Sequence, residues 1–180
     1  MACNLTTGFL TDCLEGVGGA KEVLLANWDA FETGVTYDGT TGMIDALPEA
    51  TVYRYLPLRG SLSFTQDATN SVENGTSYIA QNITFKLSGL SAAKRKEFDT
   101  LRKAKMAVFV RTAQDLIVFL GRTEGAFVTV LKEATGAAKG DMSGYEVTLV
   151  AEELEYGRYL EPYTTNPFDN FVDITVSPAY

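Results

Sequence analysis

Apolar and polar residues alternate along much of the chain, which predicts a protein built mainly from β-strands. The clearest alternation lies in residues 77–87, where one set of positions holds Ile79, Gln81, Ile83, Phe85 and Leu87. The positions between them hold Tyr78, Ala80, Asn82, Thr84 and Lys86. Successive side chains of a strand point to opposite faces, so we expect the first set to face a core and the second to form a polar surface.

The same region predicts a long β-hairpin arm. Residues 61–66 and 77–87 are expected to be its two strands, joined by a polar loop over residues 67–76. A two-stranded arm of this kind can leave its own domain and pair with a neighbouring molecule.

One segment has a helical pattern. Residues 91–105 begin at Ser91, a favourable N-cap, and are rich in Ala, Lys, Arg and Glu. Phe98 and Leu101 give this helix a narrow apolar stripe, as expected for a helix on the surface of a sheet. Further strand-like runs occupy residues 107–112, 116–122, 125–133 and 145–156. We therefore expect one mainly β domain over residues 1–180, with an antiparallel β-sandwich or barrel-like core and one flanking α-helix at about 91–105.

Both ends of the chain read as irregular segments, an N-terminal arm over residues 1–19 and a C-terminal tail over residues 161–180. Each carries large apolar side chains that would be unfavourable in water. We expect these side chains to contact a neighbouring subunit: Phe9, Leu10, Leu14, Phe168, Phe171 and Val172.

The composition removes most enzyme classes. The chain has no histidine, which excludes His-dependent nucleophilic catalysis and His metal ligands. Its two cysteines, Cys3 and Cys13, are too few for a structural zinc site, and no glycine motif indicates phosphate binding. We expect no enzymatic activity, no metal and no cofactor. No apolar run is long enough for a membrane helix and no signal peptide is visible, so we expect folding in a cytoplasm.

The formal net charge is −8, which disfavours stable binding to a DNA duplex. Charge is nevertheless unevenly spread, because six of the 15 Lys and Arg residues lie within residues 94–105. Residues 141–173 hold eight acidic residues and one base, Arg158. A solvated helix surface beside an acidic region is the commonest explanation. A nucleic-acid patch and opposite charges that meet across a subunit contact are the alternatives.

The order of these elements resembles the tail tube proteins of bacteriophages. The resemblance includes the helix after Leu-Ser-Gly-Leu-Ser (87–91) and the sequence Gly-Asp-Met-Ser-Gly-Tyr-Glu-Val-Thr-Leu (140–149). The N-terminal Met-Ala-Cys-Asn and the run Gly-Gly-Ala-Lys-Glu-Val-Leu-Leu-Ala-Asn (18–27) are similar to virion proteins of phages that infect Bacteroidetes-like hosts, including tail ring proteins of the crAss-like group. The resemblance implies a β-sandwich flanked by a helix. It also implies stacked homo-oligomeric rings, most often hexamers, through which DNA leaves the capsid.

Within this resemblance, the polar face and loop of the arm are expected to line the lumen, through Asp67, Glu73, Ala80, Asn82 and Thr84. This surface is too polar for a core and too neutral to hold phosphate, and its acids repel a duplex. DNA would pass without specific binding. The expected partners are copies of the same chain and neighbouring tail or neck proteins, in a virion assembled in the host cytoplasm.

Two other functions remain open. The chain could be a neck, connector or capsid-decorating virion protein. It could also be a monomeric β-sandwich binding module, in which case the polar face of the arm would be an ordinary solvent-facing surface.

Overall fold

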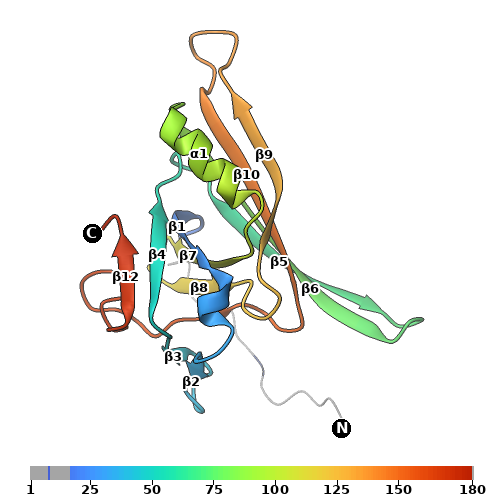
Figure 1. Ribbon diagram of the computed structural model, residues 1–180. Coiled ribbons are helices and arrows are strands. Elements are labelled where there is room, and N and C mark those ends of the chain that lie inside the picture. The colour runs from blue at the N-terminus through green and yellow to red at the C-terminus, as the bar shows by residue number, and fades with distance from the viewer. Residues whose placement is uncertain (1–7, 9–16, 180) are drawn as a thin grey trace.

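In a computed structural model that describes residue 8 and residues 17–179, the chain folds as two packed β-sheets with one α-helix (Figure 1). The larger sheet has six strands in the order β11-β8-β7-β1-β4-β12, and the smaller has four in the order β5-β6-β10-β9. A short hairpin, β2-β3, forms a separate two-stranded sheet. In chain order the strands are β1 (Ala20–Asn27), β2 (Thr36–Tyr37), β3 (Ile44–Ala46), β4 (Ala50–Tyr55), β5 (Ser63–Ser71), β6 (Thr76–Ser88), β7 (Met106–Thr112), β8 (Ile117–Leu120), β9 (Phe127–Ala134), β10 (Gly144–Glu153), β11 (Arg158–Tyr159) and β12 (Ile174–Ser177), with α1 at Ala92–Leu101 and the 3-10 helix η1 at Trp28–Phe31.

The first core lies between the two sheets and confirms the predicted β-sandwich. The six-stranded sheet contributes alternate residues such as Val23, Val108 and Val110. The four-stranded sheet contributes the expected alternate residues of β6, among them Ile83 and Phe85, which are fully buried. Two sheets that share one apolar layer in this way form a sandwich.

A second core covers the opposite face of the six-stranded sheet. Phe109 and Phe119 of this sheet stack on each other with ring centroids 4.4 Å apart, and Phe31 of η1 meets both rings edge-on. The β2-β3 hairpin and the C-terminal segment complete the layer. The central strands are therefore apolar on both faces, which explains why residues 106–110 and 117–120 are all buried.

The second core corrects the prediction that Phe168 and Phe171 contact another subunit. Their side chains are only 3% and 5% exposed, and Phe168 packs against Phe109 at 5.2 Å between ring centroids. They are core residues of their own chain. Val172 follows the buried Phe171 but is 95% exposed, so it stays a candidate contact.

The C-terminal tail is also more regular than predicted. Strand β12 pairs in parallel with β4, the one parallel pairing among the named strands of the described residues. Before it, the Asp169 carboxylate accepts hydrogen bonds from the Thr164 hydroxyl and from the backbone N–H groups of residues 164–166. These bonds lower the pKa of Asp169 well below its usual range and hold the turn that delivers Phe168 to the core.

Helix α1 begins where the sequence indicated and ends earlier. The Ser91 hydroxyl accepts a hydrogen bond from the backbone N–H of Lys94, as an N-cap should. The N–H of Arg102 still bonds four residues back to Phe98, but the N–H groups of Lys103 and Ala104 bond three residues back, which ends the α-helix. The carbonyl of Lys105 accepts a bond from the backbone N–H of Trp28 at 3.2 Å. Residues 102–105 are thus a turn into β7. Phe98 and Leu101 are the buried residues of the helix, and they join the core between the sheets.

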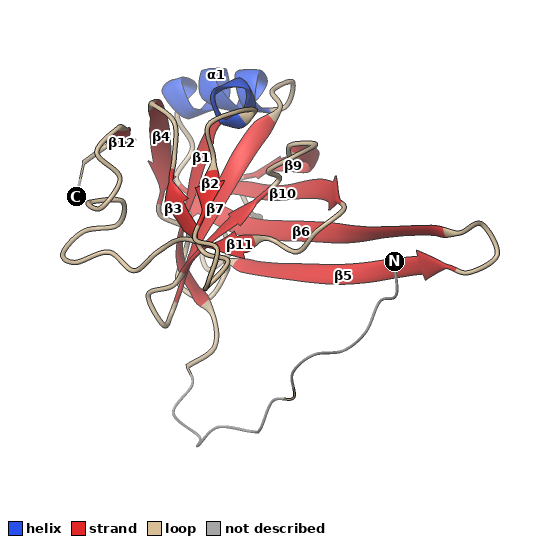
Figure 2. Cartoon of the chain, turned by 90° about the horizontal axis from the view of Figure 1, so that it is seen from below, coloured by secondary structure: helices blue, strands red, loops and turns tan. Residues whose placement is uncertain are grey.

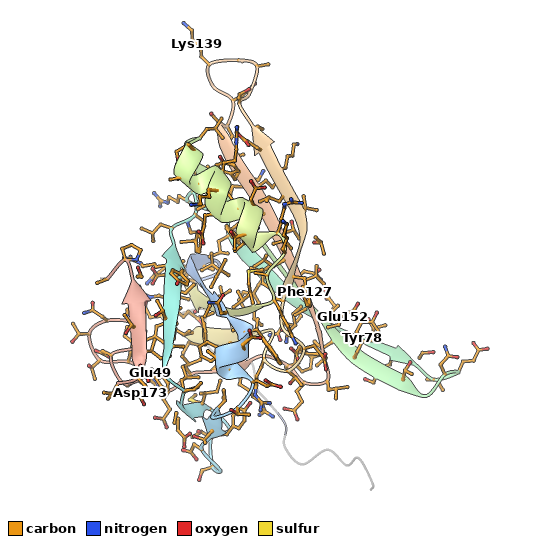
Figure 3. All side chains as sticks on the ribbon, viewed as in Figure 1. Glu49, Tyr78, Phe127, Lys139, Glu152 and Asp173 are labelled. Carbon is orange, nitrogen blue, oxygen red and sulfur yellow. The ribbon has the colours of Figure 1, made fainter. Side chains whose placement is uncertain are left out.

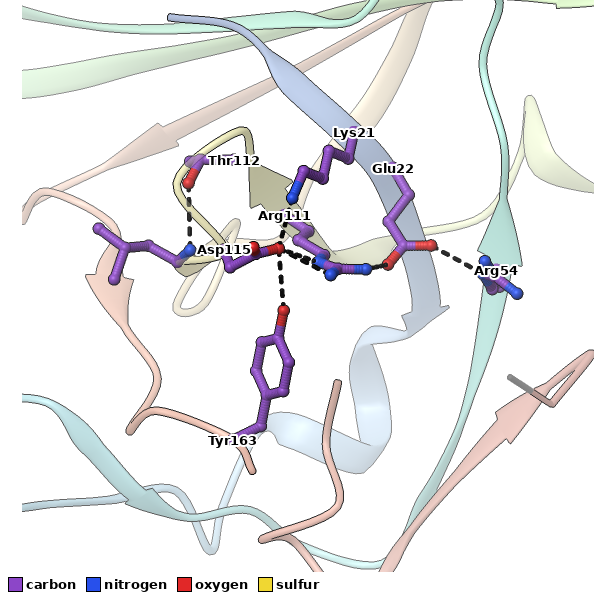
Figure 4. A network of polar contacts seen from close by, with 8 residues as sticks. Lys21, Glu22, Arg54, Arg111, Thr112, Asp115 and Tyr163 are labelled. Carbon is purple, nitrogen blue, oxygen red and sulfur yellow. Dashed lines mark hydrogen bonds and ion pairs between the residues drawn. The ribbon is translucent and has the colours of Figure 1, made fainter. Parts of the chain in front are cut away.

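A charged network crosses the six-stranded sheet on its second face (Figure 4). The Glu22 carboxylate, 2% exposed, lies between the guanidinium groups of Arg54 at 2.7 Å and Arg111 at 3.0 Å. Arg111 continues to Asp115, which also accepts bonds from Lys21 and Tyr163. The bond from Lys21, with those from Arg111 and Tyr163, lowers the pKa of Asp115 to about 2. The network ties β1, β4 and β7 to the C-terminal tail.

We predict that Glu22→Gln destabilises the fold by roughly 2–4 kcal/mol, because removing one member of a buried ion pair leaves its partners poorly compensated. Equilibrium unfolding in urea measures this change. The control is Lys21→Ala, which removes a pair whose side chains are 44% and 49% exposed and should cost less than about 1 kcal/mol. If the two variants lose similar amounts of unfolding free energy, the burial of Glu22 does not determine how much its ion pairs stabilise the fold.

Candidate functional site

The most prominent feature of the surface is the hairpin formed by β5 and β6, which projects beyond the rest of the molecule (Figure 2). It is longer than the sequence predicted. The expected loop over residues 67–76 is mostly strand, since pairing continues from Asp67 with Ala80 to Ser71 with Thr76. The turn is confined to residues 72–75 and uses Gly75 at a positive φ of 63°.

We call residues 67–78 the projecting tip. Each of them is exposed except Ser71, which is half-buried. The side chains are small or polar, apart from Val72 at 96% exposure and Tyr78 at 38%. Backbone pairing and a side-chain bond from Ser77 to Asn70 hold the tip together, without a core of its own. Its two strands therefore offer unpaired backbone groups on both sides, as an edge strand does.

The root of the hairpin is fixed by two glutamine side chains that sequence reasoning assigned no role. Gln81, 1% exposed, donates to the Gln66 side chain at 3.1 Å and accepts from the backbone N–H of Gly121 at 2.9 Å. Gln66 in turn accepts from the backbone N–H of Gly157 at 2.6 Å. These bonds satisfy backbone donors of two loops and fix the root of the hairpin against the sandwich. The sequence contained one sign of this role, because Gln81 is a polar residue at a position of β6 where the alternation predicts a core residue.

Beyond the root, the hairpin continues into a sheet surface that we call the open face. It is the side of the four-stranded sheet turned away from the first core, and the strand registers place its residues side by side: Ser63, Thr65 and Asp67 on β5, Tyr78, Ala80, Asn82, Thr84 and Lys86 on β6, Glu146, Thr148, Val150 and Glu152 on β10, and Phe127, Val130 and Lys132 on β9. Figure 3 shows Phe127 of β9, Glu152 of β10 and Tyr78 of β6 one after another across this sheet.

The open face brings together four of the five predicted lumen residues. Asp67, Ala80, Asn82 and Thr84 share it, and Thr84 lies 3.3 Å from the hydroxyl of Thr148 on the next strand. Glu73 is exposed in the turn of the tip, outside the paired strands. Three acids and two bases lie on the face, with Lys86 paired to Glu146 at 3.3 Å, so its formal charge is 2 − 3 = −1.

The four-stranded sheet has an unpaired edge on each side. Strand β5 forms one edge and β9 the other. A bulge in β9 breaks the alternation expected for residues 125–133, so that Val128 and Leu131 both pack on the core. Phe127 and Val130 remain on the open face at 49% and 47% exposure. An uncovered edge strand with exposed apolar side chains is a typical site of strand pairing between molecules.

The basic cluster around α1 is largely used within the chain. Arg95 forms two hydrogen bonds to Glu133 of β9, and Lys94 donates to the carbonyls of Ser88 and Gly89. Lys105 lies over the ring of Trp28 at 3.1 Å from its centroid. These contacts favour the interpretation of the cluster as a helix surface over that of a nucleic-acid patch.

Phe9, Leu10 and Leu14, the other predicted contacts, lie outside the described residues. Within the described part of the chain, no helix is long and apolar enough to cross a membrane. The same part contains no group of three His, Cys, Asp or Glu side chains placed to hold a metal ion.

No protein-family model matches the chain, and no curated protein matches its sequence. The resemblance to phage tail tube proteins therefore stays a prediction from the sequence.

We predict that the projecting tip can be shortened without loss of stability. Replacing residues 70–77 by Asn-Gly, a favourable two-residue turn, joins the paired residues Thr69 and Tyr78 without a change of register. It removes no buried side chain and should change the free energy of unfolding by less than about 1 kcal/mol. Urea unfolding checks this result. As a matched comparison, Gln81→Leu at the root should cost about 1–3 kcal/mol, because it leaves the N–H of Gly121 unsatisfied.

Proposed function

We propose that this chain is a subunit of a homo-oligomeric ring or tube in a bacteriophage tail, which forms a conduit for DNA during ejection. The observation that carries the proposal is the four-stranded sheet. Its open face is polar and close to neutral, both of its edges are unpaired within the described chain, and its hairpin projects outward. A stable monomer normally protects such edges.

The strand directions are compatible with closure of a ring. Strands β5 and β9 lie at opposite edges and run in opposite directions, because each neighbouring pair between them is antiparallel. When β5 of one copy lies beside β9 of the next, the new pair is antiparallel as well. The contact is head-to-tail, so repetition around an axis can close it into a ring.

The size of such a ring suits a duplex. Six copies, the number that the family resemblance implies, would bring together about 24 strands, since each copy supplies a four-stranded sheet. Strands lie about 4.8 Å apart and tilt by about 40° in barrels, which gives roughly 50 Å between facing backbones. Barrels of 16–18 strands already enclose a water-filled channel.

The electrostatics of the open face favour passage over binding. A protein that holds DNA places Lys and Arg against phosphates and releases counterions. Here no Lys or Arg lies between Arg59 and Lys86, a stretch that contains both strands of the hairpin except the end of β6. The tip adds Asp67 and Glu73, and the whole chain carries −8. A wall of this kind repels the duplex weakly and leaves water and counterions between the two.

The proposal is tested by adding cations to the open face. The triple variant Asn82→Lys, Thr84→Lys and Glu73→Lys adds four charges per subunit and should leave rings intact in electron micrographs, because these residues are exposed or half-buried. Phage that carry this variant should eject DNA more slowly and lose at least about tenfold in infectivity, because each phosphate contact now strengthens binding.

A matched control adds the same charge elsewhere, with Glu32→Lys, Thr33→Lys and Thr165→Lys at exposed positions. It should keep the infectivity of the parent. Equal infectivity of both variants would place the open face outside the lumen. Rings that never stack would favour a neck or connector part, and a monomer at all concentrations would favour a binding module.

A further inference from the structure

A groove lies at the root of the projecting hairpin and is lined by apolar and aromatic side chains together with Glu155 and Arg158, which form an ion pair at 2.9 Å. The turn between β2 and β3 (residues 41–43), Ile79 of β6, and the segment over residues 154–159 form its walls. Its volume is about 630 Å³, which falls within the range of binding clefts. Leu154, Tyr156 and Tyr159 are 78%, 54% and 43% exposed along it. Large apolar and aromatic side chains that are exposed along one groove are typical of an interaction site.

We propose that residues 9–14 of the same chain occupy this groove. They lie outside the described residues, and their sequence, Phe-Leu-Thr-Asp-Cys-Leu, supplies three large apolar side chains. The partner is therefore the chain's own N-terminal segment, which places Phe9, Leu10 and Leu14 against the aromatic wall. Docking removes apolar surface of both the groove and the segment from water.

The N-terminal segment is tethered close enough to reach. The carbonyl of Gly19 accepts a bond from the N–H of Ala113, Val110 pairs with Val118, and Val118 pairs with Tyr159. The path from Gly19 to Tyr159 crosses three spacings between neighbouring strands and runs three residues along a strand. The two residues therefore lie about 17 Å apart. An extended chain covers about 3.3 Å per residue, so from Gly19 residue 14 reaches about 16 Å and residue 10 about 30 Å.

Two properties favour this occupant over the projecting tip of a second copy. The turn of the tip offers one large apolar side chain, Val72, whereas residues 9–14 offer three. The N-terminal segment is also part of the same molecule, so its effective concentration at the groove is in the millimolar range.

Disulfide trapping tests the proposal, because both cysteines of the chain lie in the N-terminal segment. In a Cys3→Ser background, only Cys13 remains, and one new cysteine is added as Leu154→Cys or Tyr159→Cys. A disulfide requires Cα atoms about 4.4–6.8 Å apart, so it forms readily when residue 13 lies in the groove. Glutathione disulfide is the oxidant, and peptide mass spectrometry with gel mobility identifies the bond.

The control is Gln114→Cys. Gln114 is exposed and follows Ala113, whose backbone N–H bonds to the carbonyl of Gly19. The control cysteine therefore lies nearer than the groove to Gly19, where the N-terminal segment begins. Each rate is normalised to the reaction of the same thiol with a small disulfide reagent. We expect the intrachain bond to form at least about tenfold faster at one of the groove positions than at Gln114→Cys. A segment that moved freely would react with the nearer cysteine at least as fast.

A second set of variants separates docking from tethering. Leu10→Ser with Leu14→Ser should lower the groove rate to that of the Gln114→Cys control, while Thr6→Ala with Thr7→Ala should leave it unchanged. Equal normalised rates at the groove and at residue 114 overturn the proposal. Bonds that join two chains, seen as a band of twice the mass, overturn the same-chain assignment, and an unchanged rate in the serine variant excludes apolar docking.

Discussion

The architecture depends on the burial of both faces of the six-stranded sheet. Strands β7 and β8 are apolar on each side, so the chain must supply two covering layers. The four-stranded sheet forms one layer. Helix η1, the β2-β3 hairpin and the C-terminal segment form the other. No further described element covers the outer side of the four-stranded sheet, which is why that side is polar and open (Figure 1).

This constraint also determines what the projecting hairpin can be. The part of the hairpin that packs on the core holds Ile83 and Phe85 of β6, and this buried part ends at Gln81 and Ile79. The tip has no apolar layer to complete, so small polar side chains are sufficient there and backbone pairing holds the two strands together. Such an element adds little to the stability of one molecule. It gains importance when its unpaired backbone edges meet another molecule, and strand β5 carries neither Lys nor Pro along its length to prevent that.

The sequence allowed part of this structure to be predicted. The alternation in residues 77–87 identified the core and open faces of β6 correctly, and Ser91 located the start of α1. The polar stretch over residues 67–71 was interpreted as loop, because alternation reports burial and these strand residues are exposed on both faces. The core role of Phe168 and Phe171 was missed because it depends on Phe109, far away in the sequence.

Strand alternation also allowed part of the candidate site to be predicted. Strand alternation placed Ala80, Asn82 and Thr84 on one surface, and pairing in the structure adds β9 and β10 to it. The glutamine pair at the root and the groove beside it arise from contacts between distant segments, for which local patterns carry little signal.

Cryo-electron microscopy of the purified, assembled protein is the most direct test of whether the open face lines a channel. We expect closed rings in which β5 of each copy lies beside β9 of the next and the open face lines the lumen. A density map in which the open face points outward, or in which both sheet edges remain unpaired between copies, would contradict it.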